Sequence, residues 1–201
     1  MIAIIDYDAG NIKSVEKALI LLGEDVVLTR DRDVLLSASK VILPGVGSFG
    51  DSMINIRKYG LETVIHEVIK KGTLFLGICL GMQLLFESSE ESPDVPGLSV
   101  LKGKIVKIPK NQQLKIPHMG WNSLDFQKKG TLFQTLPSHP YVYFVHSFYL
   151  QADDKSIVTA TSDYGCTIEA AIEYNNVFAC QFHPEKSSCI GLKILQNFIS
   201  L

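Results

Sequence analysis

The chain has 201 residues, of which 46% are hydrophobic, and this length and composition are enough to bury the core of one domain, residues 1–201. Its formal net charge is −2 and it has no basic stripe, which argues against nucleic acid as a main partner. The longest apolar runs have only the length of a strand, so we expect no membrane span.

The N-terminal residues and the cysteines indicate a cytoplasmic protein. Residues 1–6 lack the basic segment of a signal peptide and lead directly into a predicted strand. Four cysteines without the spacing of a disulfide framework are expected to be free thiols in a reducing compartment. They are Cys79, Cys166, Cys180 and Cys189. No metal-ligand spacing occurs among the five scattered histidines, so we expect neither a metal nor another cofactor.

The first half of the chain alternates between predicted strands and predicted helices. Strands are expected at residues 2–6, 25–28, 41–43 and 74–76. Asn11 can cap a helix that Gly23 ends, and Asp51 can cap a longer helical region that stops at Gly72. Repeated strand–helix units predict an α/β fold of the flavodoxin-like kind, with three layers and a mostly parallel sheet. Helices would cover both faces, and ligands would gather at the carboxyl ends of the strands.

The second half of the chain is richer in strands. A polar loop is expected at residues 88–97, and Ser187 can cap a last helix from 188 to about 200. The predicted strands between them are 104–108, 122–126, 141–145, 156–161, 168–173 and 177–182.

Cys79 lies where a strand is expected to turn sharply into a helix over residues 82–87. Gly77 and Gly81 flank it at the two positions where a nucleophile elbow is most crowded. The dipole of the following helix would stabilise a thiolate, and the N–H of Leu80 would point toward a developing oxyanion. A buried structural cysteine is the alternative, and it is the commoner state of a free cysteine.

A second segment, His183-Pro184-Glu185, follows the last predicted strand. Pro184 restricts the backbone, so Glu185 could hold the imidazole of His183 either from the same side of an extended stretch or through a bend. An ordinary loop with a surface histidine is the alternative. Together with the cysteine elbow, however, the segment completes the parts of a nucleophilic triad.

A glycine-rich loop, Pro-Gly-Val-Gly-Ser-Phe-Gly at residues 44–50, follows another predicted strand. Its backbone amides could approach a ligand closely. A phosphate-binding loop is the competing interpretation, but the Gly-Lys-Ser/Thr and Gly-x-Gly-x-x-Gly patterns are both missing. We therefore favour a loop that stabilises an oxyanion or binds the backbone of a substrate.

These segments carry a family resemblance that spans the whole chain. The chain resembles the class I, triad-type glutamine amidotransferases, and among them the branch of glutaminase subunits that feed imidazole glycerol phosphate synthesis. The stretch at residues 117–122 is what indicates this branch. The motifs are Asp-Ala-Gly-Asn at 8–11, the glycine-rich loop at 44–50, Gly-Ile-Cys-Leu-Gly-Met-Gln-Leu-Leu-Phe at 77–86, Pro-His-Met-Gly-Trp-Asn at 117–122, Tyr-Phe-Val-His-Ser at 143–147 and Gln-Phe-His-Pro-Glu-Lys-Ser at 181–187.

The resemblance implies a mechanism. Cys79 would attack the side-chain amide of glutamine, His183 would shuttle protons and Glu185 would orient His183. Ammonia would leave from a glutamyl thioester, and water would then release glutamate. The implied oxyanion stabilisers are Val46, Gly47 and Leu80, and the implied glutamine-binding residues are Gly47, Gln83, Ser147 and Phe148.

The resemblance also implies a partner, a (β/α)₈-barrel cyclase that uses the ammonia. It would make imidazole glycerol phosphate and an aminoimidazole carboxamide ribotide for histidine biosynthesis. The residues implied to face it are His118, Met119, Trp121, Asn122, Tyr143, His146 and Lys186. For Trp121 and Tyr143 the residues alone favour ordinary packing in a core or strand.

Three rival functions are open to this sequence. A cysteine hydrolase or protease could use the same elbow. Assays with glutamine and with peptides would distinguish this rival from a glutaminase. A binding module that has lost catalysis would not need all three of Cys79, His183 and Glu185. Glutaminases for anthranilate, guanylate or pyridoxal phosphate synthesis would share the triad but would not be expected to carry the stretch at residues 117–122.

Overall fold

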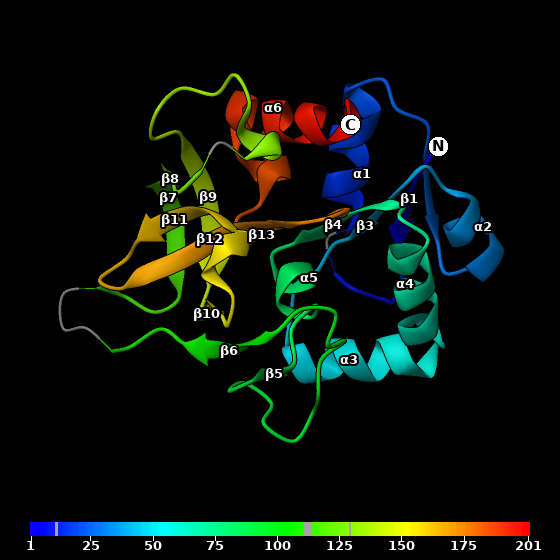
Figure 1. Cartoon of the computed structure of the whole chain (residues 1–201), viewed down its shortest axis with the longest axis horizontal. Helices are drawn as coiled ribbons and strands as arrows, with labels where there is room; N and C mark the ends of the chain where they lie inside the picture. Colours follow the sequence, from blue (N-terminus) through cyan, green and yellow to red (C-terminus); the bar gives the residue numbers. More distant parts are fainter. Residues whose placement is uncertain (11, 111–113, 129) are drawn as a thin grey trace.

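A computed structural model of the chain describes residues 1–10, 12–110, 114–128 and 130–201. Its central sheet begins with five parallel strands in the spatial order β2-β1-β3-β4-β13 (Figure 1). Their bounds are β1 (Ile2–Ile5), β2 (Val26–Thr29), β3 (Lys40–Leu43), β4 (Leu74–Ile78) and β13 (Val177–Cys180). These strands are mostly apolar because helices cover both faces of the sheet.

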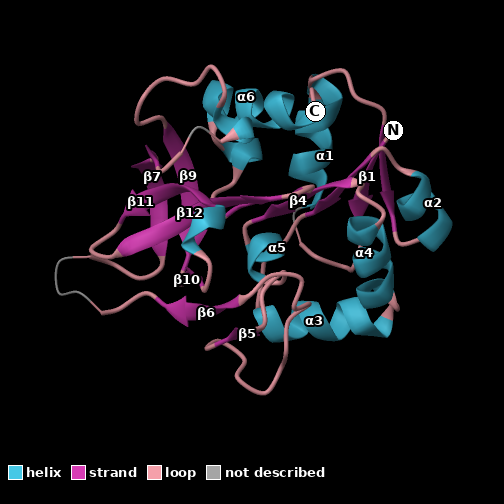
Figure 2. Ribbon diagram, in the orientation of Figure 1, coloured by secondary structure: helices cyan, strands magenta, loops and turns pink. Residues whose placement is uncertain are grey.

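Alternate residues of these strands point into two separate hydrophobic clusters. Ile2 and Ile4 join the cluster beneath α1 (Ile12–Leu21) and α6 (Ser188–Ile199). Ala3 and Ile5 join the cluster on the other face. That face is covered by α2 (Arg32–Ser37), α3 (Phe49–Lys58) and α4 (Leu61–Lys70). The helices therefore lie on both sides of the sheet (Figure 2).

The sheet continues beyond β13 with strands from the second half of the chain, most of them antiparallel. The order is β13-β12-β10-β6-β5, and β11 also pairs with β12 and with β8. A separate two-stranded sheet pairs β7 with β9. The bounds are β5 (Ser88–Ser89), β6 (Gly103–Lys107), β7 (His118–Ser123), β8 (Asp125–Phe126), β9 (Tyr141–His146), β10 (Phe148–Ala152), β11 (Val158–Asp163) and β12 (Thr167–Tyr174). The predicted fold class is confirmed. No helix among the described residues is long and apolar enough to cross a membrane.

The predicted helical region from Asp51 to Gly72 is wrong in two respects. Ser48 is the residue that caps α3, because its hydroxyl accepts from the N–H of Asp51. The region is also two helices, since Gly60 has a φ of 67° and breaks the run between α3 and α4. The predicted cap at Asn11 lies outside the described residues.

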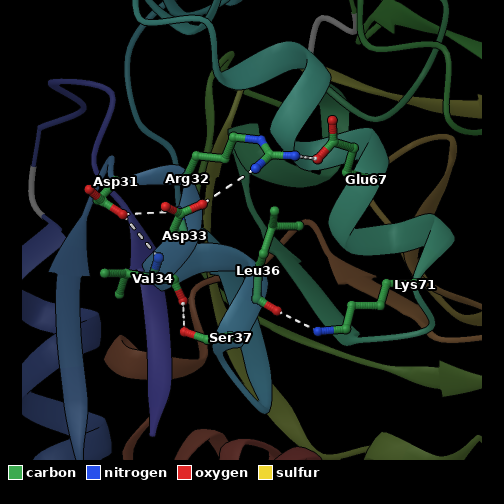
Figure 3. A network of polar contacts seen from close by, with 8 residues as sticks. All are labelled: Asp31, Arg32, Asp33, Val34, Leu36, Ser37, Glu67 and Lys71. Carbon is green, nitrogen blue, oxygen red and sulfur yellow. Dashed lines mark hydrogen bonds and ion pairs between the residues drawn. The ribbon is translucent and has the colours of Figure 1, made fainter.

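Helix α2 was not predicted; it begins at a local cap, buries Leu35 in the core and also contacts a distant part of the chain. Asp31 caps it by accepting from the N–H groups of Asp33 and Val34. Arg32 pairs with Glu67 of α4 at 2.6 Å, and the ammonium of Lys71 donates to the carbonyl of Leu36 at 2.7 Å (Figure 3). These partners are 35 residues away, so the periodicity of this short segment could not reveal them.

Three further elements also differ from the prediction. The expected strand at 122–126 is divided, because residues 122–123 pair with β9 in the two-stranded sheet, whereas Asp125–Phe126 form β8 and pair with β11. The expected helix at 82–87 is wrong, because α5 spans Leu80–Gln83 and ends there. The carbonyls that would have continued it accept instead from N–H groups of residues 98–101. Strand β10 was not predicted.

Candidate active site

Cys79 lies on a sharp turn between β4 and α5, with a φ of 54° that few non-glycine residues adopt. The turn is as crowded as expected. A Cβ on Gly81 would lie 1.9 Å from the carbonyl oxygen of Leu43, and one on Gly77 would lie 2.8 Å from the oxygen of Gly81. Only glycine fits at either position, and the turn aims the thiol at the carboxyl edge of the sheet.

His183 follows β13, the strand that lies beside β4 in parallel (Figure 1). A short 3₁₀ helix, Pro184–Lys186, bends the chain so that Glu185 returns to the imidazole. Nδ1 of His183 and Oε1 of Glu185 are 2.8 Å apart, and both side chains are only 2% exposed. Of the two geometries considered for this segment, the structure therefore contains the bend.

Two neighbours determine the electrostatics of His183. Burial lowers the pKa of its imidazole, but Cys79 and Glu185 raise it, and the outcome is a pKa of about 9. Nε2 has no hydrogen bond of good geometry to the described residues, although the thiol is near enough to influence the ring. Catalytic hydrogen bonds are often long before substrate binds.

The glycine-rich loop lies against the elbow. A Cβ on Gly45 would lie 2.7 Å from the hydroxyl of Tyr7, which itself donates to the carbonyl of Pro44 at 2.8 Å. The N–H of Leu80 points at the carbonyl of Gly45 at 3.4 Å, and Gly47 has a φ of 105°. In this arrangement the N–H of Leu80 is directed at a carbonyl and is not free to stabilise an oxyanion.

A cavity of about 330 Å³ lies over Cys79 and His183. The structure brings to it every residue predicted to bind glutamine or to stabilise the oxyanion. Those lining residues are Val46, Gly47, Leu80, Gln83, Ser147 and Phe148. The volume is at the lower end for ligand pockets, as suits a small substrate.

Two polar residues had no predicted role, one behind the cavity wall and one on it. Gln181 is fully buried, accepts from the amide of Gln83 at 2.9 Å and directs its own amide at the sulfur of Cys79, 3.7 Å away. Glu91 lines the cavity and accepts from the N–H of Phe49 at 2.8 Å. The polar composition of residues 88–97 indicated only a loop, and nothing in it singles out Glu91.

Some residues expected to face a partner do lie at the surface. Met119 is 61% exposed and Trp121 is 52% exposed, and the ring of Trp121 meets that of Tyr143 edge to face at 6.0 Å. Tyr141, which was not predicted, is 59% exposed on the neighbouring strand. We call Met119 and its three aromatic neighbours Trp121, Tyr141 and Tyr143 the aromatic face. Lys186 is also exposed, and Asn122 is partly buried.

For His118 and His146 the expectation of a partner-facing position is wrong, since they are 2% and 6% exposed. Successive side chains of a strand point to opposite sides, so the residues next to Met119 and Val145 must point inward. His118 stacks on Phe144, and His146 lines the cavity.

The histidines predict how stability depends on pH. Burial lowers the pKa of His118 to about 4 and that of His146 to about 3. Their contribution to the free energy of unfolding is therefore present above pH 6.5 and is lost as the pH falls. His183, with its raised pKa, contributes below pH 6.5 and loses that contribution as the pH rises through 9. We expect the free energy of unfolding from these three groups to be largest near about pH 6.5. Denaturant titrations from acid to alkaline pH will measure this. His118→Asn should make the free energy of unfolding depend less on pH below pH 6.5. An unchanged dependence there would contradict the lowered pKa of His118.

Comparison with known proteins agrees with this geometry. The family described as "Glutamine amidotransferase class-I" matches residues 3–201, and the chain belongs to it. The chain is 48% identical to "Imidazole glycerol phosphate synthase subunit HisH 1" of Methanococcus maripaludis, over 100% of both chains. It is 46% identical to the HisH subunit of Bacillus subtilis, over 100% of this chain and 96% of that one. A solved structure titled "Crystal structure of glutamine amidotransferase" matches with a TM-score of 0.76 at 20% identity, over 98% of this chain and 97% of that one. The family resemblance expected from the sequence is confirmed.

Proposed function

We propose that this chain is the glutaminase subunit of an imidazole glycerol phosphate synthase, a single cytoplasmic domain that releases ammonia from glutamine for histidine biosynthesis. The observation that carries the proposal is the meeting of Cys79 with the His183–Glu185 pair at one edge of the sheet, over a small cavity. The names of the relatives at 46–48% identity over the full chain support the particular synthase.

The residues of the cavity account for each step of the hydrolysis. The sulfur of Cys79 attacks the amide carbon of glutamine as a thiolate whose proton is held by His183, in keeping with the raised pKa of that imidazole. His183 then protonates the leaving nitrogen, ammonia departs and a glutamyl thioester remains. A water deprotonated by His183 attacks the thioester, and glutamate and the thiol are released. Glu185 holds Nδ1 throughout and stabilises the imidazolium.

The rest of the cavity supplies the groups that hold glutamine. Gln83, Ser147, Phe148 and the acidic residue Glu91 all line it. We assign Glu91 to the α-ammonium group, because it is an acidic side chain on the wall of the cavity. Once the Gly45–Val46 peptide has turned its carbonyl away, the N–H of Val46 would point into the site and could hold the oxyanion together with the N–H groups of Leu80 and Gly47.

A partner subunit fits both the chemistry and the surface. Free ammonia is mostly protonated at neutral pH and is then no longer nucleophilic, so it must pass to its acceptor without entering bulk water. The aromatic face exposes large side chains on β7 and β9, and β9 leads into the cavity wall. We assign this face, together with Lys186 and Asn122, to a (β/α)₈-barrel cyclase that binds a phosphoribosyl-ribulosyl nucleotide.

The proposal predicts that the partner switches the glutaminase on. A missing oxyanion donor costs on the order of 10²–10³ in rate, and in this structure the Leu80 N–H points at a carbonyl instead. We expect the subunit alone to be slower than the complex with cyclase and its nucleotide by about that factor. Glutamate release should be measured for the subunit alone, with cyclase, and with cyclase plus nucleotide.

One control and one contradicting outcome accompany this measurement. A peptide substrate in place of glutamine tests for a protease, and turnover of peptides without turnover of glutamine would replace the proposed function with that rival. If the isolated subunit is as fast as the complete complex, the glycine-rich loop is fixed in an active form and no switch exists.

A further inference from the structure

A chain of polar side chains runs from β7 through the protein interior to the cavity. His118 and His146 face each other across the two-stranded sheet, and Nδ1 of His118 is 3.0 Å from Nε2 of His146. Asn122 lies at the outer end, with Nδ2 3.4 Å from Nε2 of His118. At the inner end Nδ1 of His146 is 2.9 Å from the carbonyl oxygen of Phe148.

The hydrogen-bond donors in this row of polar side chains all point toward the cavity. A carbonyl can only accept, so Nδ1 of His146 carries a proton and donates to Phe148. Burial keeps both rings neutral near pH 7, so Nε2 of His146 must accept, and Nδ1 of His118 is its donor. Nε2 of His118 is then left as an acceptor for the amide of Asn122. Each proton position follows from the one beside it.

The rings of the two histidines are fixed by packing. His118 is stacked between Phe144, at 4.6 Å, and Tyr164, at 3.8 Å, measured between ring centroids. Burying two imidazoles is costly unless their nitrogens are satisfied, and an apolar pair could fill the same space without that cost. The polar pair therefore has a purpose other than filling the core.

The role of the histidine pair follows from the contacts at the inner end of this row of polar side chains. The carbonyl of Phe148 accepts a second hydrogen bond from the amide of Gln83, at 2.9 Å. The same amide donates to Gln181, which is in contact with the sulfur of Cys79. The carbonyl of Val145, one residue before His146, is also 4.0 Å from that sulfur. His146 thus anchors the middle of a wall, residues 145–148, that touches both the nucleophile and the substrate cavity.

We propose that His118 and His146 are positioning residues that hold the wall at 145–148 in its glutamine-binding form. The inference rests on the proposed function, because it assumes that glutamine binds against this wall. Neither ring is assigned a proton-transfer step. His146 orients the Phe148 carbonyl from one side, Gln83 orients it from the other, and His118 keeps His146 in the tautomer that can donate.

The test compares variants that remove a hydrogen bond with variants that keep it. His146→Leu fills the space but has no donor, whereas His146→Asn places an amide N–H close to the position of Nδ1. In the complex with the cyclase and its nucleotide, we expect His146→Leu to raise the KM for glutamine about tenfold, as a buried carbonyl loses a partner. The kcat should change less, and His146→Asn should recover most of the loss in KM.

A second matched pair covers the case in which His146→Leu does not fold. His118→Leu leaves His146 without its donor and should raise KM by a smaller factor, while His118→Asn keeps a donor and should stay near wild type. Equal KM values for wild type and both leucine variants would overturn the inference, as would leucine and asparagine variants that are impaired equally. A wild-type complex without glutaminase activity would overturn the proposed function as well, so the two failures are distinguishable.

Discussion

Replacing Cys79 with alanine is expected to lower the rate of glutamine hydrolysis by a factor on the order of 10⁶, the loss seen when the nucleophile of a triad is removed. The reason is chemical, since no thioester can form without the sulfur. Cys79 is 6% exposed on a turn shaped by its two glycine neighbours, and alanine fits there at least as easily as cysteine. Folding and partner binding should therefore be retained. Glutamate release by the purified complex is the measurement.

The other cysteines are built-in controls for this prediction. An electrophilic analogue of glutamine should modify Cys79 well ahead of the other three. Burial raises the pKa of Cys180 and also that of Cys166, so both thiols are poor nucleophiles. Cys189 is exposed but lies outside the cavity. Cys189→Ser should keep wild-type activity. Substantial turnover by a pure Cys79→Ala complex, or preferential labelling of Cys180, would disprove the assignment of the nucleophile.

Replacing His183 with alanine is expected to cost at least as much as replacing Glu185, and the loss of an orienting acid can itself cost on the order of 10⁴ in rate. In the proposed mechanism His183 moves protons at two steps, whereas Glu185 only holds the ring, through one contact of 2.8 Å between buried atoms. The kcat of His183→Ala, Glu185→Ala and Glu185→Gln should be compared in the complex with the cyclase.

The Glu185→Gln variant separates orientation from charge. Its amide oxygen can still accept from Nδ1, but the negative charge that raises the pKa of His183 is gone. We expect the acid limb of its pH–rate profile to move to lower pH, and kcat at neutral pH to lie between those of wild type and Glu185→Ala. Wild-type rates for His183→Ala would refute the proposed role of the imidazole.

The parts of the active site that lie within a few residues of one another could be predicted from the sequence. The steric reason for Gly77 is local, because a Cβ there would meet the carbonyl of Gly81 four residues on, although Gly81 itself is packed against Leu43 of β3. His183 and Glu185 are only two residues apart. The alternating strands and helices of the first half follow from local periodicity, and their carboxyl ends meet at one edge of a parallel sheet. Such patterns suffice for the fold class and for the prediction that Cys79 is the nucleophile and His183 the base.

Other features depend on contacts between distant residues, and only the tertiary structure decided them. Whether His118 faces a partner or the core depends on the register of β7 with β9, since a shift of one residue would turn every side chain over. The carbonyl of Gly45 meets Leu80, 35 positions further along the chain, and Gln181 reaches Cys79 from 102 positions away. A local pattern contains no information about these partners. The sequence by itself therefore determined which residues are predicted as nucleophile, base and orienting acid. The packing of the sheet determined which side chains surround them and hold them in place.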